Sequence, residues 1–217
     1  MYRIFACLLP LIVAISSGHS APKLKEETSP FYYPTGVGFT RVLIVRISGL
    51  KYETLETVEA TERKDGYWIV TVVSGGREWS QKFTRYRVSR MSVSFFSDRG
   101  NSGQASDPSV CFLRLPAKAG DSWECPSPYG GPDRKCTYKT IGEEEVEVPA
   151  GKFRAVRVEG EEQFWGTTYR VTRWFVPGLG AVKTVTVWDD KEKVEELKTT
   201  INRSSQYGPG REKQGRN

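Results

Sequence analysis

The sequence predicts an all-β fold built as an antiparallel meander. Short runs of β-branched and aromatic residues recur about every ten residues, and turn-forming residues separate them. Helical periodicity is almost absent. Because the connections between consecutive runs are short, antiparallel pairing is favoured over parallel crossovers, which need intervening helices.

The runs expected as strands share this composition. In chain order they are "FTRVLIVRI" (39–47), "ETLETVEATER" (53–63), "YWIVTVV" (67–73), "REWSQKFTRYRV" (77–88), "MSVSFF" (91–96), "VCFLRL" (110–115), "CTYKTI" (136–141), "EEEVEVP" (143–149), "KFRAVRVEG" (152–160), "TTYRVTRWFV" (167–176), "GAVKTVTVWD" (180–189) and "VEELKTTI" (194–201). The breaks between them are rich in Gly, Pro, Asp and Ser, as at 64–66, 75–76, 97–109, 119–121, 149–151 and 177–178.

The segment "VPAGKFRAVRVEG" (148–160) is predicted to be a hairpin turn followed by a strand. The proline of its Pro-Ala-Gly step presets one backbone angle, and the glycine can take a positive φ. After the turn, Phe153 and Ala155 share one phase, whereas Val156 and Val158 share the opposite phase. This phase slip indicates either a β-bulge at that point or a strand covered on both faces. Outward glutamates on the preceding run are expected to pair with the basic residues of this strand.

Residues 1–20 are typical of a secretory signal peptide. Arg3 supplies a positive start, and Ile4 to Ile15 form an apolar run that is too short for a comfortable membrane span. We therefore expect an exported, soluble protein without a transmembrane segment, secreted to the bacterial periplasm or the medium.

The remaining chain is expected to contain one folded domain. Residues 21–30 are rich in Lys, Glu, Thr, Ser and Pro and indicate an exposed linker. Residues 31–201 hold all the strand-like runs and form the predicted all-β domain. Residues 202–217 lack apolar periodicity and indicate a flexible basic tail.

The charge and the histidine content of the chain argue against several classes of function. The net charge of +6 is modest, and the chain is rich in both basic and acidic residues. Together with export, this argues against nucleic acid as a partner. The single histidine, His19, lies in the predicted signal peptide, so imidazole-dependent catalysis and histidine-ligated zinc are excluded for the processed chain. A carboxylate pair could hydrolyse a glycoside, but the candidate acids fall on outward faces or hairpin tips. We therefore expect no enzyme, no cofactor and no metal.

The cysteines outside the signal peptide are Cys111, Cys125 and Cys136. A disulfide between Cys125 and Cys136 is predicted, because they flank the Pro- and Gly-rich segment "PSPYGGPDRK" in a compartment that permits disulfides. Cys111 is expected either to be buried as a small apolar residue or to form a disulfide between two chains. A three-thiolate metal site is the weaker alternative, since the spacing lacks the short pairs of zinc ligands.

Four blocks of the sequence resemble landmarks of a TapB-like group of secreted bacterial domains. They are "YYPTGVG" (32–38), "LRLPAKAGDSWEC" (113–125), "GEEEVEVPAGKFRAVRVE" (142–159) and "RWFVPGLGAVK" (173–183). The resemblance implies an exported domain with a curved antiparallel sheet or an incompletely closed barrel, similar in outline to lipoprotein-carrier half-barrels. It carries over no catalytic residue.

Tryptophans are the candidate ligand contacts on such a curved sheet. Trp68, Trp79, Trp165 and Trp174, four of the six in the chain, could line a trough for a lipid or stack on sugar rings. The alternative is that they fill the core of the β fold.

A second candidate site is an anion patch formed by Lys82, Arg85 and Arg87. Arg85 and Arg87 share a strand face that could meet phosphate, sulfate or carboxylate groups. The alternative is a solvated strand edge that discourages aggregation.

The function expected from these features is that of a non-catalytic envelope protein, monomeric, that binds an apolar or glycan ligand on its curved sheet. The alternative is a structural or interaction module of a cell-surface assembly, whose partner would be an envelope or surface protein.

Overall fold

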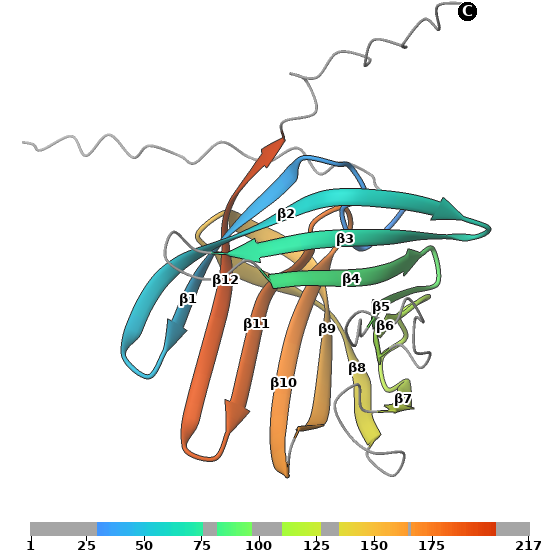
Figure 1. Ribbon diagram of the computed structural model, residues 1–217. Helices are drawn as coiled ribbons and strands as arrows, with labels where there is room; N and C mark the ends of the chain where they lie inside the picture. Colours follow the sequence, from blue (N-terminus) through green and yellow to red (C-terminus); the bar gives the residue numbers. More distant parts are fainter. Residues whose placement is uncertain (1–29, 76–81, 97–109, 127–134, 165, 203–217) are drawn as a thin grey trace, which may run out of the picture.

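The structure, a computed structural model, describes residues 30–75, 82–96, 110–126, 135–164 and 166–202 (Figure 1). The predicted signal peptide, Trp79, Trp165 and nearly all of the predicted linker and tail lie outside these residues. The regular elements of the described chain are all strands: β1 (Phe39–Ile47), β2 (Leu50–Lys64), β3 (Tyr67–Gly75), β4 (Lys82–Ser89), β5 (Ser92–Phe96), β6 (Val110–Arg114), β7 (Ser122–Pro126), β8 (Lys135–Val148), β9 (Gly151–Phe164), β10 (Thr167–Val176), β11 (Gly180–Trp188) and β12 (Lys191–Asn202).

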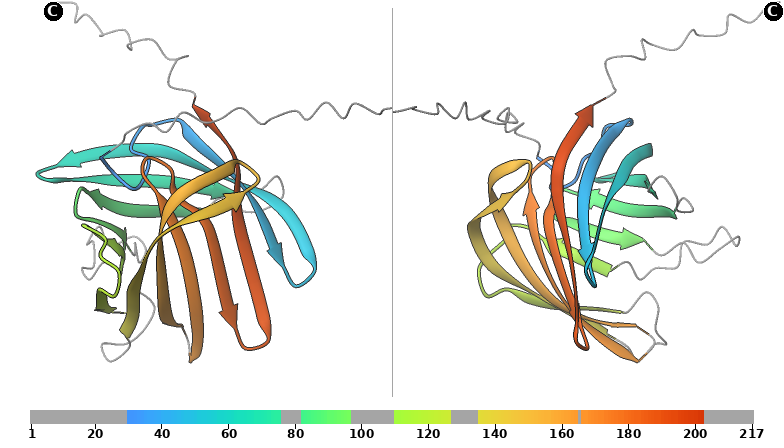
Figure 2. Two further views of the ribbon diagram at one scale, coloured as in Figure 1. Left: turned by 180° about the vertical axis from the view of Figure 1, so that it is seen from behind. Right: turned by 90° about the vertical axis from the view of Figure 1, so that its left-hand side faces the viewer.

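The 12 strands form one antiparallel sheet that rolls into a nearly closed barrel. Their order is β6-β5-β4-β3-β2-β1-β12-β11-β10-β9-β8-β7. Consecutive strands of the chain pair with each other, with the exception of β6 and β7. In addition, β1 pairs with β12, from Phe39↔Asn202 to Ile47↔Lys193. The remaining edges, β6 and β7, meet at a seam without a backbone ladder. The predicted all-β antiparallel meander and the incompletely closed barrel are therefore confirmed (Figures 1 and 2).

Two strand predictions are wrong in detail. Runs 136–141 and 143–149 form the single strand β8, because Ile141 is an extra residue in a bulge and Gly142 (φ 141°) continues the ladder opposite Arg157. β7 lies outside the expected runs, because it is short and only Trp123 and Cys125 alternate as buried residues.

The main core fills the seam side of the barrel. Inward residues such as Val70, Val88 and Leu113 pack there with almost no exposed surface. At the seam, Trp123 Nε1 donates a 2.8 Å hydrogen bond to the Cys111 carbonyl oxygen, and the Trp123 ring stacks on Tyr138 at 5.8 Å between centroids. Side chains thus join β6 to β7 where backbone hydrogen bonds do not.

The segment before β1 closes one end of the barrel. The Gly178 amide donates a 2.7 Å hydrogen bond to the Phe31 carbonyl, and the Gly38 amide donates a 2.8 Å bond to the Val58 carbonyl. Tyr33, between these anchors, is 4% exposed and belongs to the main core. We call this the closed end of the barrel.

The hairpin of β8 and β9 arches over the outer surface at the closed end (Figure 2). Its turn donates a 3.0 Å hydrogen bond from Ala150 N to Leu197 O of β12. Phe153 and Ala155 pack in a second cluster with Leu197, whereas Val156 and Val158 belong to the main core. The strand is therefore covered on both faces, and the bulge lies on its partner β8.

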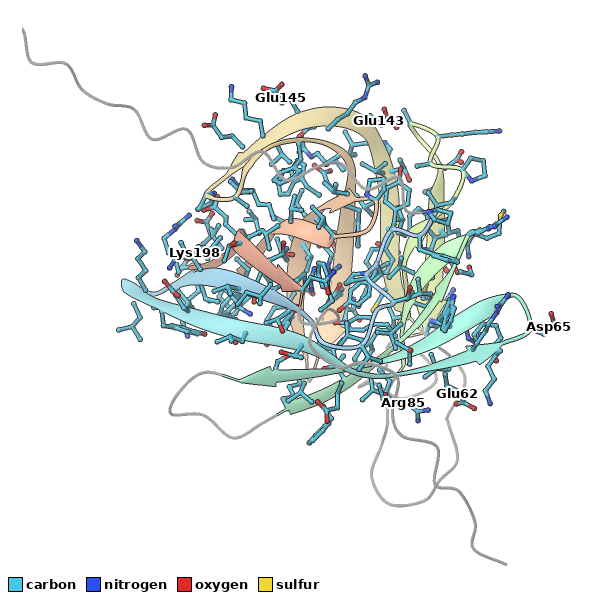
Figure 3. All side chains as sticks on the ribbon, turned by 90° about the horizontal axis from the view of Figure 1, so that it is seen from above. Glu62, Asp65, Arg85, Glu143, Glu145 and Lys198 are labelled. Carbon is cyan, nitrogen blue, oxygen red and sulfur yellow. The ribbon has the colours of Figure 1, made fainter. Side chains whose placement is uncertain are left out.

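The outer side of this hairpin carries the predicted ion pairs. Arg154 Nε lies 2.7 Å from Glu143, and Lys152 lies 3.5 Å from Glu145 and 3.6 Å from Glu147. Figure 3 shows Glu143 and Glu145 on the outside of the arch. Because these side chains are exposed, each pair stabilises the fold by less than about 1 kcal/mol.

Candidate ligand-binding cavity

A cavity of about 840 Å³ lies inside the barrel. Strands from both halves of the chain form its walls, because the alternation of each strand places every second side chain inside. On β1, Arg41, Leu43 and Val45 line it, and on β11 Thr184 and Thr186 do so. These walls meet because β1 pairs with β12.

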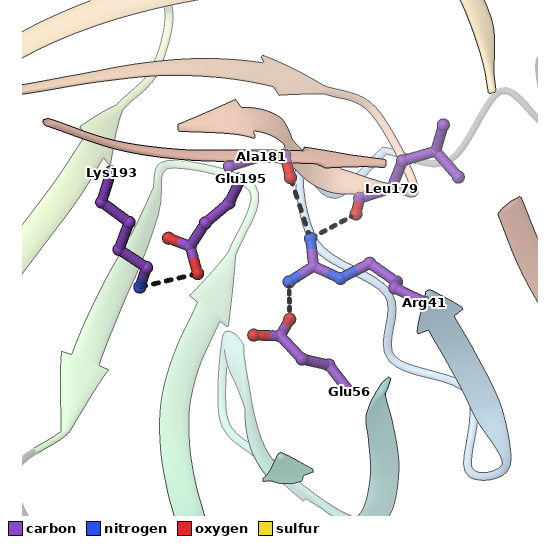
Figure 4. A network of polar contacts seen from close by, with 6 residues as sticks. All are labelled: Arg41, Glu56, Leu179, Ala181, Lys193 and Glu195. Atoms are coloured by element: carbon purple, nitrogen blue, oxygen red, sulfur yellow. Dashed lines mark hydrogen bonds and ion pairs between the residues drawn. The ribbon is translucent and has the colours of Figure 1, made fainter. Parts of the chain in front are cut away.

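The first polar group of the cavity is an ion pair at the closed end. Arg41 bonds Glu56 through Nη2, and its Nη1 donates to the carbonyls of Leu179 at 2.9 Å and Ala181 at 3.2 Å (Figure 4). Burial alone would lower the pKa of Arg41, but the Glu56 carboxylate together with Tyr33 and Tyr86 outweighs it and raises the pKa. Arg41 therefore stays charged. Gly180 makes room for it, since a Cβ there would lie 2.6 Å from Arg41 Nη1.

Two tyrosines lie beside this pair. The rings of Tyr33 and Tyr86 are 4.5 Å apart between centroids, and the Arg41 guanidinium lies 5.2 Å from the Tyr33 centroid. Burial, with the Glu56 carboxylate second, raises the pKa of Tyr86 to about 12. Burial also raises the pKa of Tyr33 well above its ordinary value. Both side chains are therefore neutral hydroxyls at physiological pH.

A second ion pair faces the first from β9 and β10. Arg173 Nη1 lies 2.8 Å from Glu162 Oε1, which also accepts a 2.9 Å hydrogen bond from the Tyr138 hydroxyl. The Arg173 guanidinium lies 4.2 Å from the centroid of Phe112. Burial would lower the pKa of Arg173, but its polar neighbours, Glu162 first among them, raise it overall, so Arg173 also stays charged.

Toward the opposite end, between the β1–β2 and β11–β12 turns, the lining becomes more exposed. Arg41 is 6% exposed, whereas Tyr52 is 37% exposed. Hydroxyl side chains also line the cavity: Thr54, Ser74, Thr84, Thr184 and Thr186. Near the β11–β12 turn, at what we call the open end, the rings of Tyr169 and Trp188 lie 5.5 Å apart between centroids. Lys193 pairs with Glu195 at 2.8 Å (Figure 4).

Of the predicted ligand-facing tryptophans, the structure describes Trp68 and Trp174, and neither is among the residues that line the cavity. Trp68 packs against the main core, with Arg63 5.8 Å from its ring centroid. Trp174 packs against the second cluster and donates a 2.6 Å hydrogen bond to Glu144. Trp188, which sequence reasoning did not select, lines the cavity. Its inward position could have been predicted from the sequence, because it shares the inward face of β11 with Thr184 and Thr186.

The predicted anion patch is divided between the two faces of β4. Lys82 lines the cavity. Arg85 and Arg87 have the opposite phase, and Figure 3 shows Arg85 on the outside of the barrel. The Arg87 guanidinium lies 4.9 Å from the Tyr67 ring centroid. The three side chains therefore do not form one surface.

The predicted disulfide between Cys125 and Cys136 is not present. The register places the two residues opposite each other on β7 and β8, but the Cys125 sulfur is turned toward β6. There it accepts a 3.3 Å hydrogen bond from the Cys111 amide. Burial raises the pKa of the Cys125 thiol and also that of the Cys111 thiol. Cys111 packs against the main core.

Neither a metal cluster nor a membrane helix occurs in the described part of the chain. Its His, Cys, Asp and Glu side chains form no group of three or more that could hold a metal ion. No helix within these residues has the length and apolar character to cross a bilayer.

Comparisons with solved structures identify proteins of similar fold. No family model matches the chain and no curated protein matches it by sequence, so the resemblance to the TapB-like group stays a prediction. A crystal structure of a provisionally assigned lipoprotein from Parabacteroides distasonis ATCC 8503 matches with a TM-score of 0.54 and 13% identity, over 81% of this chain and 100% of that one.

A second crystal structure also matches the chain by fold. It is that of a provisionally assigned exported protein with a YmcC-like fold from Bacteroides fragilis NCTC 9343, with a TM-score of 0.56 and 14% identity. It covers 79% of this chain and 99% of that one. At these identities, the shared property is the fold: a rolled antiparallel sheet found in proteins assigned to export or lipid attachment.

Proposed function

We propose that the chain is an exported, non-catalytic envelope protein that binds a small ligand inside its barrel. The cavity of about 840 Å³ is the observation that carries the proposal. Ligand sites in proteins are concave and about 300 to 1,000 Å³ in volume, and they combine apolar walls with a few fixed polar groups. The aromatic rings and the two ion pairs described above match that combination.

Export is supported by two independent observations. The first twenty residues have the charge and apolar pattern of a secretory signal peptide. The two solved proteins of the same fold are assigned as a lipoprotein and as an exported protein.

Binding without catalysis is supported by the ionisation of the cavity groups. General acid–base catalysis works best with groups whose pKa lies near the working pH. In this cavity, Tyr33, Tyr86 and Arg41 all have pKa values raised away from neutrality. These three groups are therefore suited to positioning a ligand rather than to exchanging protons with it.

Native mass spectrometry of protein purified from its own envelope tests this function. The wild-type protein is expected to carry a small non-covalent adduct. Thr184→Phe, which fills the cavity from β11, is expected to lose the adduct, whereas the control Thr199→Phe, at an exposed position on β12, retains it. A wild-type protein that carries a defined protein partner and no small molecule would instead support an interaction module.

A further inference from the structure

We propose that the ligand of this cavity is an uncharged, hydroxyl-rich ring compound, such as a neutral sugar unit, rather than an ionic headgroup or a bare acyl chain. The inference rests on the proposed function, because it names the chemical class bound in the same cavity. Three features of the lining carry it: buried charges that are already paired, a set of hydroxyl side chains and a pair of aromatic rings.

The charges of the two buried ion pairs cancel within each pair. Arg41 is paired with Glu56 and Arg173 with Glu162, and the side chains of these pairs are between 7% and 19% exposed. An ionic ligand would bring a charge without a counterion into this desolvated region, which is costly in a low-dielectric interior. A neutral ligand adds no charge.

The second ion pair already binds a hydroxyl group. The Tyr138 hydroxyl donates to Glu162 Oε1 at 2.9 Å, while Arg173 contacts the same oxygen at 2.8 Å. A hydroxyl both donates and accepts, so it can satisfy a carboxylate and a guanidinium together. The Arg173 side chain keeps 16% of its surface exposed in the cavity, where a ligand hydroxyl can reach it.

The hydroxyl side chains of the lining disfavour a bare hydrocarbon. Five Ser or Thr side chains line the cavity, from β2, β3, β4 and β11. An acyl chain against these hydroxyls would displace their water and return no hydrogen bond, which costs free energy for each group. The hydroxyls of a sugar would replace the lost water contacts.

The aromatic pair supplies the apolar part of the site. Tyr169 and Trp188 line the cavity with their ring centroids 5.5 Å apart and their planes tilted by 35°. A sugar ring has an apolar face of C–H groups as well as polar edges. It can place that face against an aromatic ring while its hydroxyls meet the threonine side chains of the lining.

The experiment compares matched probes on the wild-type protein. Saturation-transfer NMR and tryptophan fluorescence are recorded with neutral probes (methyl glucoside, methyl N-acetylglucosaminide, cellotriose), with their charged counterparts glucosamine and glucuronate, and with dodecanoate. Binding of at least one neutral probe, stronger than that of either charged sugar and of dodecanoate, is the expected result.

Two variants locate the binding. Trp188→Ala is expected to weaken the neutral probe about tenfold through loss of the aromatic face. Glu162→Gln leaves Arg173 without its counterion and is expected to raise glucuronate affinity about tenfold. The matched control Glu161→Gln changes the next residue, which is exposed, and is expected to leave both affinities unchanged. Circular dichroism checks that each variant is folded, and the wild-type comparison stands even where a variant is not.

The outcomes separate this inference from the proposed function. If dodecanoate or glucuronate binds the wild-type protein and no neutral probe does, the sugar assignment is wrong, while a ligand-binding cavity remains supported. If no probe binds and purified protein carries no adduct, both are overturned.

Discussion

The two ends of the cavity are built from different chemistry. At the closed end, Arg41 and Glu56 are nearly buried, and the backbone of the β10–β11 turn completes the hydrogen bonding of the guanidinium. At the open end, Lys193 and Glu195 form an ion pair whose side chains are 32% and 24% exposed. The same type of interaction therefore has a structural role at one end and little energetic weight at the other. Stability is expected to depend on the closed end, and ligand contact on the open end.

The largest effect is expected from breaking the buried pair. Arg41→Met leaves the Glu56 carboxylate without its counterion at a position of 19% side-chain exposure. Loss of one partner of a buried pair costs about 3 to 5 kcal/mol in the free energy of unfolding. Urea unfolding measures this, and Arg154→Met, on the exposed hairpin pair, serves as the control with less than about 1 kcal/mol. Equal losses in the two variants would show that the closed end has no special structural role.

The next effect is expected at alkaline pH. Burial raises the pKa of Tyr86 to about 12, above its ordinary value of 10.0 in the unfolded chain. Its contribution is fully present below about pH 10 and is lost as the pH rises toward 12, because the unfolded state ionises first. The loss should reach about 2 to 3 kcal/mol. Unfolding curves recorded from pH 9 upward, compared with Tyr86→Phe, measure it, and an identical pH dependence in the variant would contradict the assignment.

A glycine near the second ion pair gives a smaller effect. A Cβ at Gly160 would lie 2.4 Å from Cδ1 of Tyr138, whose hydroxyl bonds Glu162. Gly160→Ala is expected to cost about 1 to 3 kcal/mol through overpacking. Gly36→Ala is the control, because no atom lies within 4 Å of its added Cβ. Thermal unfolding of both variants distinguishes them, and an unchanged midpoint for Gly160→Ala would show that the ring can move aside freely.

The smallest effect is expected at the open end. Lys193→Ala removes the partly exposed partner of Glu195 and should change stability by less than about 1 kcal/mol. Denaturant unfolding in low and high salt checks this value. A loss comparable to that of Arg41→Met would remove the distinction between the two ends.

The fold was largely predictable because its signals are local. Inward and outward residues alternate along runs such as 180–189, and short turns join consecutive strands. The bulge at Ile141 was not predictable in the same way, since Ile-Gly resembles a break until the register with β9 is known. The short strand β7 also lacked a local signal, because it has only five residues.

The site was less predictable because it joins distant parts of the chain. Arg41 has the inward phase of β1, but its partners, Glu56 and the carbonyls of residues 179 and 181, come from β2 and from the β10–β11 region. Cys125 and Cys136 do lie opposite each other, as the sequence indicated. The Cys125 sulfur, however, accepts a hydrogen bond from the Cys111 amide across the seam. Strand phase alone also could not tell which inward tryptophan faces a cavity rather than the filled core.

Amide chemical-shift mapping by NMR, with the ligand that copurifies or the neutral sugar that binds best, tests the central claim most directly. The account predicts that the shifts cluster on inward positions of the open end, at Tyr169, Thr184, Thr186 and Trp188. Shifts confined to the outer surface of the β8–β9 hairpin, with these four amides unchanged, would show that the barrel interior is not the binding site.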